Sequence, residues 1–594
     1  MLHTFGYNNT SKNILIARTV WSDFGSHIPL IRSFSMGDNF DLLLRFQSPV
    51  YPIFSGQPIR YHFLFYMVVG LLEKLGMRLD WALNIPSILG FTLLLTGIWS
   101  LAIVLFKEKK IAFLSVLFFL FNGSLSFLKF FSDHPLSLDT PLDIIRTSAF
   151  PAFGPWDGGM VSAFWNLNIY TNQRHLGLAF GIILLFIYWI TRRSLSPVAL
   201  NSKHQAPSTK QAPRINNRFQ SLIFRTWNLE FVWNLMLGIW NLRTALLWGL
   251  LIGLFPYFHQ PSLLIFAILL AWYFLAFPRL RNTLAVTSLT ATLLILPQIA
   301  TLSSFGNSNF EHWNLFGIWK LVLGASSTWF PGYLIFDRLT MTNFLSFWFQ
   351  NLGLHAFLVP LGFFLIPKST RRILFPLFIL FVIGNLFKFS VEVAANHKFF
   401  NFALILGYMI SAFVVTQLFQ NIKRFFKHWI IGLLDYWIIG LLVVFLTLSG
   451  LIDFFVIFND TKGTLADVGN NQTASWIVAN TPKDAVFLNS SFLYHPASLA
   501  GRKVFMGWPY FAWSAGYDTY KRNDEMKLMY ESRDPAVFCP LLKQYDISYI
   551  TVEDTEGDPN LPMIDLNYFR DSFQPVFKDS EEKIWIYQTS ALCP

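Results

Sequence analysis

Apolar runs of roughly 18 or more residues recur along most of this chain, and each is long enough for a helix to cross the hydrocarbon core of a bilayer. Only 13% of the 594 residues are charged, whereas 54% are hydrophobic. A soluble protein of this length needs more charge to cover its surface. The sequence therefore predicts a polytopic α-helical membrane protein with about ten spans, at approximately 84–106, 111–128, 175–191, 244–258, 261–277, 283–300, 344–366, 373–388, 399–420 and 430–456.

The basic residues gather in every second loop between these runs. By the positive-inside rule such loops lie in the cytoplasm, so the formal net charge of +11 reflects membrane topology and we expect no nucleic-acid partner. The intervening loops then face outward, together with residues 1–83 and everything after 457. The loops predicted to be cytoplasmic are 107–110, 192–243, 278–281, 368–372 and 423–427.

Three parts follow from this topology. Residues 1–83 are expected to form an extracytoplasmic loop with interfacial helices, because the apolar run at 61–76 is short and contains Glu73 and Lys74. Residues 84–456 form the transmembrane helical domain. Residues 457–594, where the composition changes to alternating helix and strand patterns, are predicted to be an extracytoplasmic α/β domain. Since no span precedes the first loop, we expect a helix upstream of this chain start.

Two cysteines, Cys539 and Cys593, both lie in the predicted α/β domain. On the oxidising side of the membrane they suit a disulfide, and two unpaired buried thiols are the alternative. No Cys or His spacing typical of a metal site is present.

The stretch WSDFGSHIPLIRSFSMGDNF opens the first outer loop with a cluster of ionisable groups. Asp23 and His27 are four residues apart, so a helix would place them on one face. Asp23 also suits a helix cap, which is the simpler interpretation. Further along the loop, Arg60 and His62 come directly before the apolar run at 61–76. An acid, a histidine and an arginine at the membrane boundary suit a polar substrate carried on a lipid.

Two stretches resemble the GT-C superfamily of integral membrane glycosyltransferases. They are the pattern SDFGSHIPLIRSFSMGDNF…PIRYHF within residues 21–66 and the segment WIVANTPKDAVFL…GRKVFMGWPY…GYD within about 475–520. The resemblance implies inverting transfer of a sugar, of hexosyl type, from a polyprenyl-phosphate donor to a glycan, lipid or protein acceptor. It places the reaction on the outer face of a bacterial plasma membrane, with the C-terminus outside.

Asp23 is our candidate general base, because a sugar hydroxyl is a poor nucleophile and a carboxylate can take its proton. The phosphate of the donor needs cations or hydrogen-bond donors around it. Lys398 stands out because positive charge in an outer loop goes against the topological trend, although pairing with Glu392 is an alternative. The candidate phosphate ligands are Arg60, His62, Arg174, His175, His397 and Lys398; the candidates for a second acid or for acceptor binding are His27, Asp133, Asp157 and Glu392.

Several alternatives stay open at this point. Mg²⁺ or Mn²⁺ could bind Asp23 with a second carboxylate, but no spacing demands it. His259, before the helix-breaking Pro261, is expected in a tight turn near the active face. The aromatic segment 501–522 fits acceptor binding or an ordinary domain core. A transporter or flippase would carry charges inside its spans, as 84–106 and 344–366 do not. A non-catalytic scaffold is not separated from an enzyme by sequence.

Overall fold

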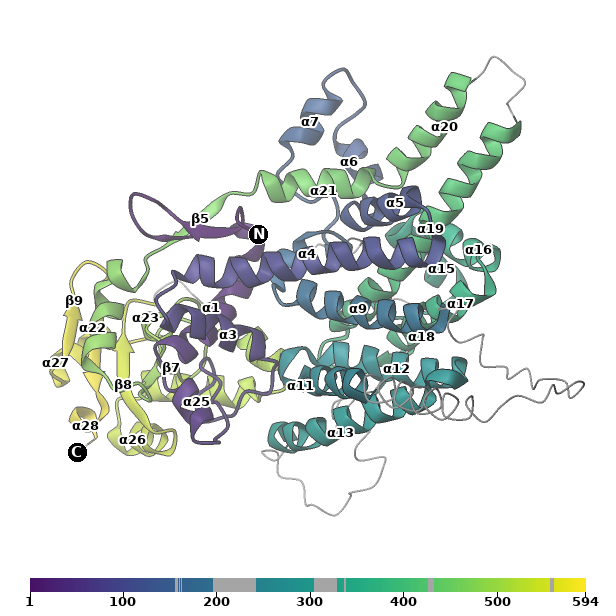
Figure 1. Cartoon of the computed structure of the whole chain (residues 1–594). Coiled ribbons are helices and arrows are strands. Elements are labelled where there is room, and N and C mark those ends of the chain that lie inside the picture. Colours follow the sequence, from purple (N-terminus) through teal and green to yellow (C-terminus); the bar gives the residue numbers. More distant parts are fainter. Residues whose placement is uncertain are drawn as a thin grey trace, which may run out of the picture.

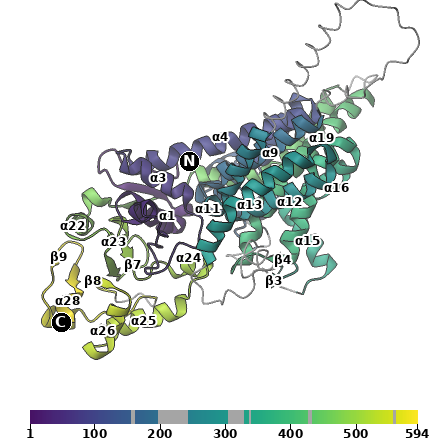
Figure 2. The ribbon, with the colours of Figure 1, turned by 60° about the horizontal axis from the view of Figure 1, so that its bottom comes forward.

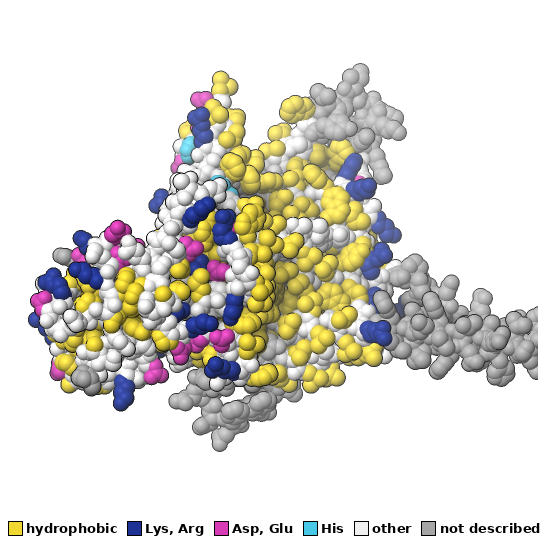
Figure 3. Space-filling model, turned by 60° about the vertical axis from the view of Figure 1, so that its left-hand side comes forward, with side chains coloured by type: hydrophobic (Ala, Val, Ile, Leu, Met, Phe, Trp, Pro, Cys, Tyr) yellow, Lys and Arg dark blue, Asp and Glu magenta, His cyan; other side chains and the backbone are white. Residues whose placement is uncertain are grey.

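The computed structural model describes residues 1–154, 159, 161, 163–195, 242–303, 328–335, 338–425, 432–555 and 560–593. Long helices lie side by side in one half, and the C-terminal α/β part lies at one end of them (Figures 1 and 2). Apolar side chains dominate the surface of the helical half, whereas charged side chains are scattered over the α/β part and gather again at the opposite end (Figure 3). The chain is an integral multi-pass membrane protein.

Five helices in the described part are long and apolar enough to cross a membrane, or up to seven spans if two bent pairs each count as one. The bent pairs are Met341–Leu352 with His355–Leu365, at 90°, and Trp437–Phe445 with Leu448–Phe458, at 55°. The single spans expected at 244–258 and 261–277 are the shorter apolar helices Leu242–Phe258 and Gln260–Ala276. The five helices that are long and apolar enough to cross a membrane are Leu79–Phe106, Leu176–Leu195, Pro278–Gln298, Lys368–Leu386 and Val393–Asn421.

Two of the expected spans differ from straight helices. The run 344–366 breaks at Gly353, whose φ of +53° leaves the helical region, and a Cβ there would meet the carbonyl oxygen of Gly123. The helix expected at 111–128 is shorter than predicted: α5 ends at Leu120. The helices of this half are α4 (Leu79–Phe106), α5 (Lys109–Leu120), α6 (Ser126–Asp133), α7 (Thr140–Arg146), α8 (Asn168–Asn172), α9 (Leu176–Leu195), α11 (Phe255–Phe258), α12 (Gln260–Ala276), α13 (Arg281–Ser303), α15 (Met341–Leu352), α16 (His355–Leu365), α17 (Lys368–Leu374), α18 (Pro376–Leu386), α19 (His397–Phe425), α20 (Gly432–Phe445) and α21 (Leu448–Phe458).

The N-terminal segment packs against the start of the C-terminal part. Strands β1 (Phe5–Tyr7) and β2 (Ile14–Ala17) form an antiparallel sheet with β5 (Lys462–Leu465), in the order β1-β2-β5. Helices α1 (Trp21–Ser35), α2 (Asn39–Leu44) and α3 (Leu64–Lys74) follow the strands. The N-terminal strands are therefore hydrogen-bonded to the start of the C-terminal part, although hundreds of residues separate them.

The C-terminal part is built on a five-stranded mixed sheet, in the order β7-β6-β8-β10-β9. β6 pairs in parallel with β7 and β8, and β10 pairs antiparallel with β8 and β9. The strands are β6 (Val486–Leu488), β7 (Lys503–Val504), β8 (Ile547–Val552), β9 (Phe577–Asp579) and β10 (Ile584–Gln588), and the helices are α22 (Gln472–Asn480), α23 (Pro496–Leu499), α24 (Pro509–Ser514), α25 (Thr519–Glu531), α26 (Pro535–Gln544), α27 (Leu566–Ser572) and α28 (Thr589–Leu592).

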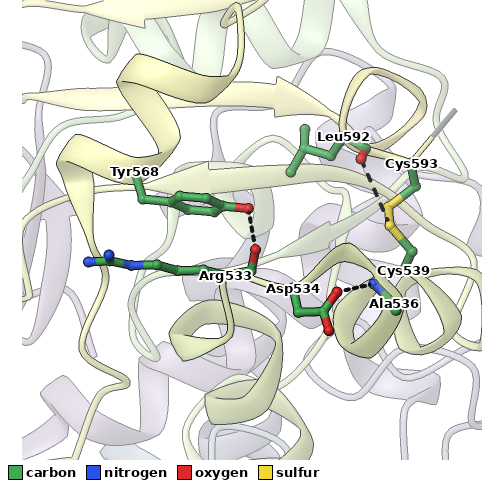
Figure 4. The surroundings of a disulfide bond; sticks show 7 residues. All are labelled: Arg533, Asp534, Ala536, Cys539, Tyr568, Leu592 and Cys593. Atoms are coloured by element: carbon green, nitrogen blue, oxygen red, sulfur yellow. Dashed lines mark hydrogen bonds between the residues drawn. A yellow bond between two sulfur atoms is a disulfide. The ribbon is translucent and has the colours of Figure 1, made fainter.

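Of the two alternatives for the cysteines, the structure has the disulfide. Cys539 on α26 is bonded to Cys593, which follows α28 (Figure 4). Asp534 caps α26 nearby, where its carboxylate accepts a hydrogen bond of 2.9 Å from the backbone N–H of Ala536. The bond closes a loop with a sequence separation of 54 residues that includes strands β8, β9 and β10.

A buried ion-pair cluster joins three of these segments. Arg32, on α1, is 2% exposed and lies between two carboxylates, with Nε 3.0 Å from Glu73 of α3 and Nη2 2.9 Å from Asp467 after β5. The hydroxyl of Tyr7 on β1 donates a hydrogen bond of 2.6 Å to Asp467, and that of Ser35 donates one of 2.6 Å to Glu73. All the charged groups of the cluster are therefore paired.

Replacing the buried arginine should destabilise the fold strongly. Arg32→Met leaves Glu73 and Asp467 without their counter-ion, and breaking a buried pair costs about 3–5 kcal/mol. Lys129→Ala is the matched control, because Lys129 and Asp133 form an exposed pair worth about 0.2–1 kcal/mol. Thermal unfolding of the purified chain in detergent measures the difference. Equal melting temperatures for the two variants would contradict the importance of the Arg32 cluster.

Removing the disulfide should destabilise the C-terminal part. A loop of this length gives a chain-entropy stabilisation of about 4 kcal/mol, and measured values are typically about 2–4 kcal/mol. We therefore expect the double variant Cys539→Ser with Cys593→Ser to melt at a lower temperature than the wild type under non-reducing conditions. A reductant should lower the melting temperature of the wild type toward that of the variant. A wild type that melts unchanged in reductant, with its thiols shown to be free, would contradict this expectation.

Candidate functional site

Asp23 lies in the first turn of α1, where the helical half meets the C-terminal part. It does not cap the helix: the N-cap position is Val20, with no side-chain hydrogen bond, so the simpler interpretation of Asp23 is not met. No hydrogen bond or ion pair joins its carboxylate to another residue in the described part of the chain. The side chain is partly exposed. The carboxylate therefore has no hydrogen-bond or ion-pair partner among the described residues.

Burial raises the pKa of Asp23 from its ordinary value of 3.8 to about 6. The positive charge of Lys398 and the backbone N–H of Asp23 itself oppose this rise, whereas the negative charge of Glu392 adds to it. An acid with such a pKa is ionised at neutral pH and is a stronger base than an ordinary aspartate. This is the property that proton abstraction from a hydroxyl group requires.

Lys398 approaches Asp23 from the second residue of α19. It is 7% exposed, and no hydrogen bond or ion pair joins it to a described residue. The expected alternative, a pair with Glu392, is not formed within 4 Å; Glu392 instead accepts a hydrogen bond of 2.6 Å from the hydroxyl of Tyr510 on α24. A buried ammonium without a counter-ion is costly, so an anionic ligand beside Lys398 would be favoured.

Three histidines form a cluster next to these residues. The Nε2 atoms of His62 and His175 are 2.9 Å apart, and the ring of His259 lies 5.0 Å from that of His62 and 5.1 Å from that of His175, centre to centre. All three side chains are buried. Burial, and then the charges of His175, His259 and Lys398, lower the pKa of His62 well below its ordinary value. His62 is therefore neutral, and the positive charge expected of it as a phosphate ligand is absent.

His27 and Arg174 are also buried, and both contact neighbouring residues in the interior of the protein. The ring of His27 stacks on Tyr66 at 4.7 Å, and burial, with a smaller effect of Arg174, lowers its pKa to about 3. Although α1 places it one turn from Asp23, it is a neutral interior side chain. Arg174 is 0% exposed and donates hydrogen bonds to Thr171 O, Asn84 Oδ1, Thr4 Oγ1 and Met1 O. These bonds occupy its guanidinium, so we do not retain Arg174 as a phosphate ligand.

The remaining sequence candidates lie in varied surroundings. The guanidinium of Arg60 stacks over Tyr517 at 4.7 Å and donates a hydrogen bond to Gly516 O, which ties the first loop to the C-terminal part. His397 stacks on Phe164 at 4.4 Å, with its ring nitrogens near Gln173 and Asn401. Asp133 pairs with Lys129 on α6 and is 48% exposed. Asp157 lies outside the described residues.

We define the candidate site as Asp23, Tyr61, Glu392, Lys398 and Tyr510. Tyr61 precedes His62, and burial raises its pKa, with the charge of Asp23 adding to the rise. Sequence reasoning missed the two tyrosines. For Tyr510 the aromatic composition of 501–522 was a signal, but nothing local to Tyr510 marks its contact with Glu392, which is 118 residues away.

Among the residues that the structure describes, the group of three His, Cys, Asp or Glu side chains that could share a metal ion is His62, His175 and His259, and it does not include Asp23. This set offers nitrogen ligands, whereas Mg²⁺ and Mn²⁺ prefer oxygen. We therefore assign no step of the chemistry at Asp23 to a bound metal.

No protein-family model matches the chain, and no curated protein sequence matches it. Solved structures with some similarity include the Archaeoglobus fulgidus oligosaccharyltransferase tethered with an acceptor peptide, at 13% identity and a TM-score of 0.46, covering 92% of this chain and 66% of that one. The oligosaccharyltransferase AglB from the same organism, in complex with an inhibitory peptide and a dolichol-phosphate, has 12% identity and a TM-score of 0.46, covering 97% of this chain and 71% of that one.

ArnT from Cupriavidus metallidurans, bound to undecaprenyl phosphate, has 10% identity and a TM-score of 0.45, covering 96% of this chain and 94% of that one. The chain thus spans about two thirds of the length of the oligosaccharyltransferase. Any activity therefore has to be argued from the residues described above.

The raised pKa of Asp23 can be measured directly. We expect its protonated carboxyl, seen in the infrared difference between wild type and Asp23→Asn, to increase as the pH falls through about 6. Lys398→Met removes the positive charge that opposes the rise, so the midpoint should move to higher pH, whereas Lys398→Arg should leave it nearly unchanged. A midpoint near 4 in the wild type would contradict the burial of this group.

Proposed function

We propose that this protein transfers a sugar from a polyprenyl-phosphate donor to a glycan, lipid or protein acceptor on the outer face of the membrane. One observation carries the proposal: the carboxylate of Asp23, with a pKa of about 6 and no hydrogen-bond or ion-pair partner among the described residues, is electrostatically coupled to the buried Lys398. A base and a cation that are coupled in this way match the two halves of a transfer from a lipid phosphate.

In the proposed reaction Asp23 takes the proton of an acceptor hydroxyl group, while the oxygen of that hydroxyl group attacks the anomeric carbon of the sugar. The bond from that carbon to the phosphate oxygen breaks, and the lipid phosphate leaves with the electron pair. Attack opposite the leaving group inverts the configuration of the anomeric carbon. General-base assistance of this kind typically contributes about 100- to 10,000-fold.

Lys398 is the candidate partner of the phosphate. A charge-assisted hydrogen bond from its ammonium would stabilise the negative charge that develops on the leaving oxygen. The charge of Lys398 has no counter-ion among the described residues within 4 Å, so the phosphate would supply one. Of the other sequence candidates, Arg60 and His397 already contact neighbouring side chains, and His62 is neutral.

Two features could hold the lipid and the sugar. A cavity of about 200 Å³, lined mainly by apolar side chains of the first loop and by Tyr257, reaches Phe63, two residues after Tyr61. It has room for a short part of a prenyl chain. Tyr510 presents an aromatic ring at the site and belongs to the C-terminal part, which we propose helps to hold the sugar or the acceptor.

Turnover by the purified chain in lipid nanodiscs, supplied with a panel of polyprenyl-phosphate sugars, tests the proposal. We expect sugar release to rise with pH through about 6, because Asp23 must be ionised to accept a proton. Asp23→Asn should reduce the rate by about 100- to 10,000-fold. Asp133→Asn is the control, because Asp133 is an outer-loop aspartate paired with Lys129, and its rate should be unchanged.

Different outcomes separate the alternatives. Lys398→Met should reduce the rate, and Lys398→Arg should restore part of it if the role is to hold a phosphate. Turnover that is the same in wild type and Asp23→Asn would remove Asp23 from the centre of the reaction. A folded chain that flips labelled lipid between leaflets without releasing sugar would favour a flippase, and one inactive in both assays would favour a scaffold.

A further inference from the structure

The histidine cluster is not used by the proposed transfer, and its geometry has a feature of its own. His62 comes from the end of the first loop, His175 directly precedes α9, and His259 lies between α11 and α12. One ring nitrogen of each lies within 4.8 Å of the other two. Three separate segments thus bring three ligand atoms to one buried point.

The hydrogen bonds of the rings identify the atoms that face this point. The Nδ1 atom of His259 is 2.7 Å from the hydroxyl of Ser262, and the Nδ1 atom of His175 is 3.3 Å from the hydroxyl of Tyr66. Their Nε2 atoms therefore remain for the interior of the cluster. Metal-ligating histidines characteristically have their other ring nitrogen held by such a second group.

One of the ligand atoms of the cluster lacks a partner in the protein. His259 is 0% exposed, and its Nε2 has no hydrogen-bond partner. Buried polar atoms are nearly always satisfied, so each exception calls for an explanation. His62 and His175 can share one proton across their 2.9 Å contact, but the third ring then has nothing to bind. A cation at the centre would use all three lone pairs.

We propose that His62, His175 and His259 bind a zinc ion through their Nε2 atoms. Zinc–nitrogen bonds of about 2.0–2.1 Å in a tetrahedron place the nitrogens roughly 3.3–3.4 Å apart, so the observed separations, which are at most 4.8 Å, would have to change by up to about 1.5 Å. Three nitrogen ligands suit zinc and other borderline metals and do not suit Mg²⁺ or Mn²⁺. The inference stands independently of the proposed transfer reaction.

The fourth coordination position of such an ion would remain open to an oxygen ligand. Lys398 lies near enough for its charge to act on all three rings. Its charge opposes a second cation, and an anionic oxygen at the open position would offset both charges. The site therefore fits a zinc ion that carries hydroxide or an oxyanion.

His355 provides a matched control within the same chain. It is also buried, and its Nδ1 is 2.9 Å from the hydroxyl of Ser411, just as Ser262 holds His259. Among the described residues, however, no histidine ring adjoins it; its neighbours are Phe118 and Tyr408. His355→Ala thus removes a buried imidazole that is hydrogen-bonded to a serine, as His259→Ala does, but it leaves the three clustered histidines unchanged.

Metal analysis of the full-length chain, purified in detergent without added chelator, tests the proposal. We expect about one zinc ion per chain in the wild type and in His355→Ala, and at least about a tenfold lower content in His259→Ala. Zinc in equal amounts in wild type and His259→Ala, or no zinc in any of them together with no uptake on addition, would overturn the proposal.

A second measurement does not depend on the variants folding. The wild-type chain is stripped with a chelator and titrated with Co²⁺, which absorbs visible light strongly when its coordination is tetrahedral. We expect this absorption to saturate at about one equivalent, to be displaced by Zn²⁺, and to be unaffected by excess Mg²⁺. The absence of tetrahedral Co²⁺ absorption in the folded wild type would overturn the proposal.

Discussion

The buried charge of Arg32 determines where the first helix lies. Its guanidinium contacts Glu73 and Asp467, which belong to segments on either side of the long helical region. Taking three charges out of water is costly, and the cost is offset only when all of them are paired with good geometry. α1 is therefore held in one position against α3 and the start of the C-terminal part. Asp23, in the first turn of α1, is held with it.

The candidate site depends on the contact between the helical half and the C-terminal part. The hydroxyl of Tyr494 donates a hydrogen bond to the backbone oxygen of Trp21, and the two rings pack edge to face at 4.8 Å. Tyr510 reaches Glu392 in the short loop before α19. Both contacts lie beside Asp23 and Lys398. The C-terminal part thus completes the surroundings of the carboxylate as well as covering the end of the helices.

Much of the candidate site could be predicted from local sequence, and the residues whose surroundings differ from expectation share one cause. The outward loops that carry Asp23, Glu392 and Lys398 were expected on the same face, and their electrostatic coupling agrees with this. Arg174 and His62 were expected as cationic ligands because they adjoin apolar runs. In the structure both are buried: Arg174 donates hydrogen bonds to Thr171, Asn84, Thr4 and Met1, and burial lowers the pKa of His62 well below its ordinary value. The exposure of a side chain depends on which distant segments pack against it, and the residues next to it in the sequence do not show this.

The sequence by itself determined the class of this protein. Apolar runs enter the bilayer and basic loops stay in the cytoplasm because of their own composition, whatever the rest of the chain does. Tertiary structure decided the partner of each ionisable group. Arg32 meets Asp467 across 435 residues, and His62 meets His175 across 113. Likewise, the run 344–366 has the composition of a span, yet it is bent by 90° at a break that contains Gly353, against which the backbone of Gly123 lies. Such contacts arise from packing between distant segments, and no periodicity within one segment encodes them.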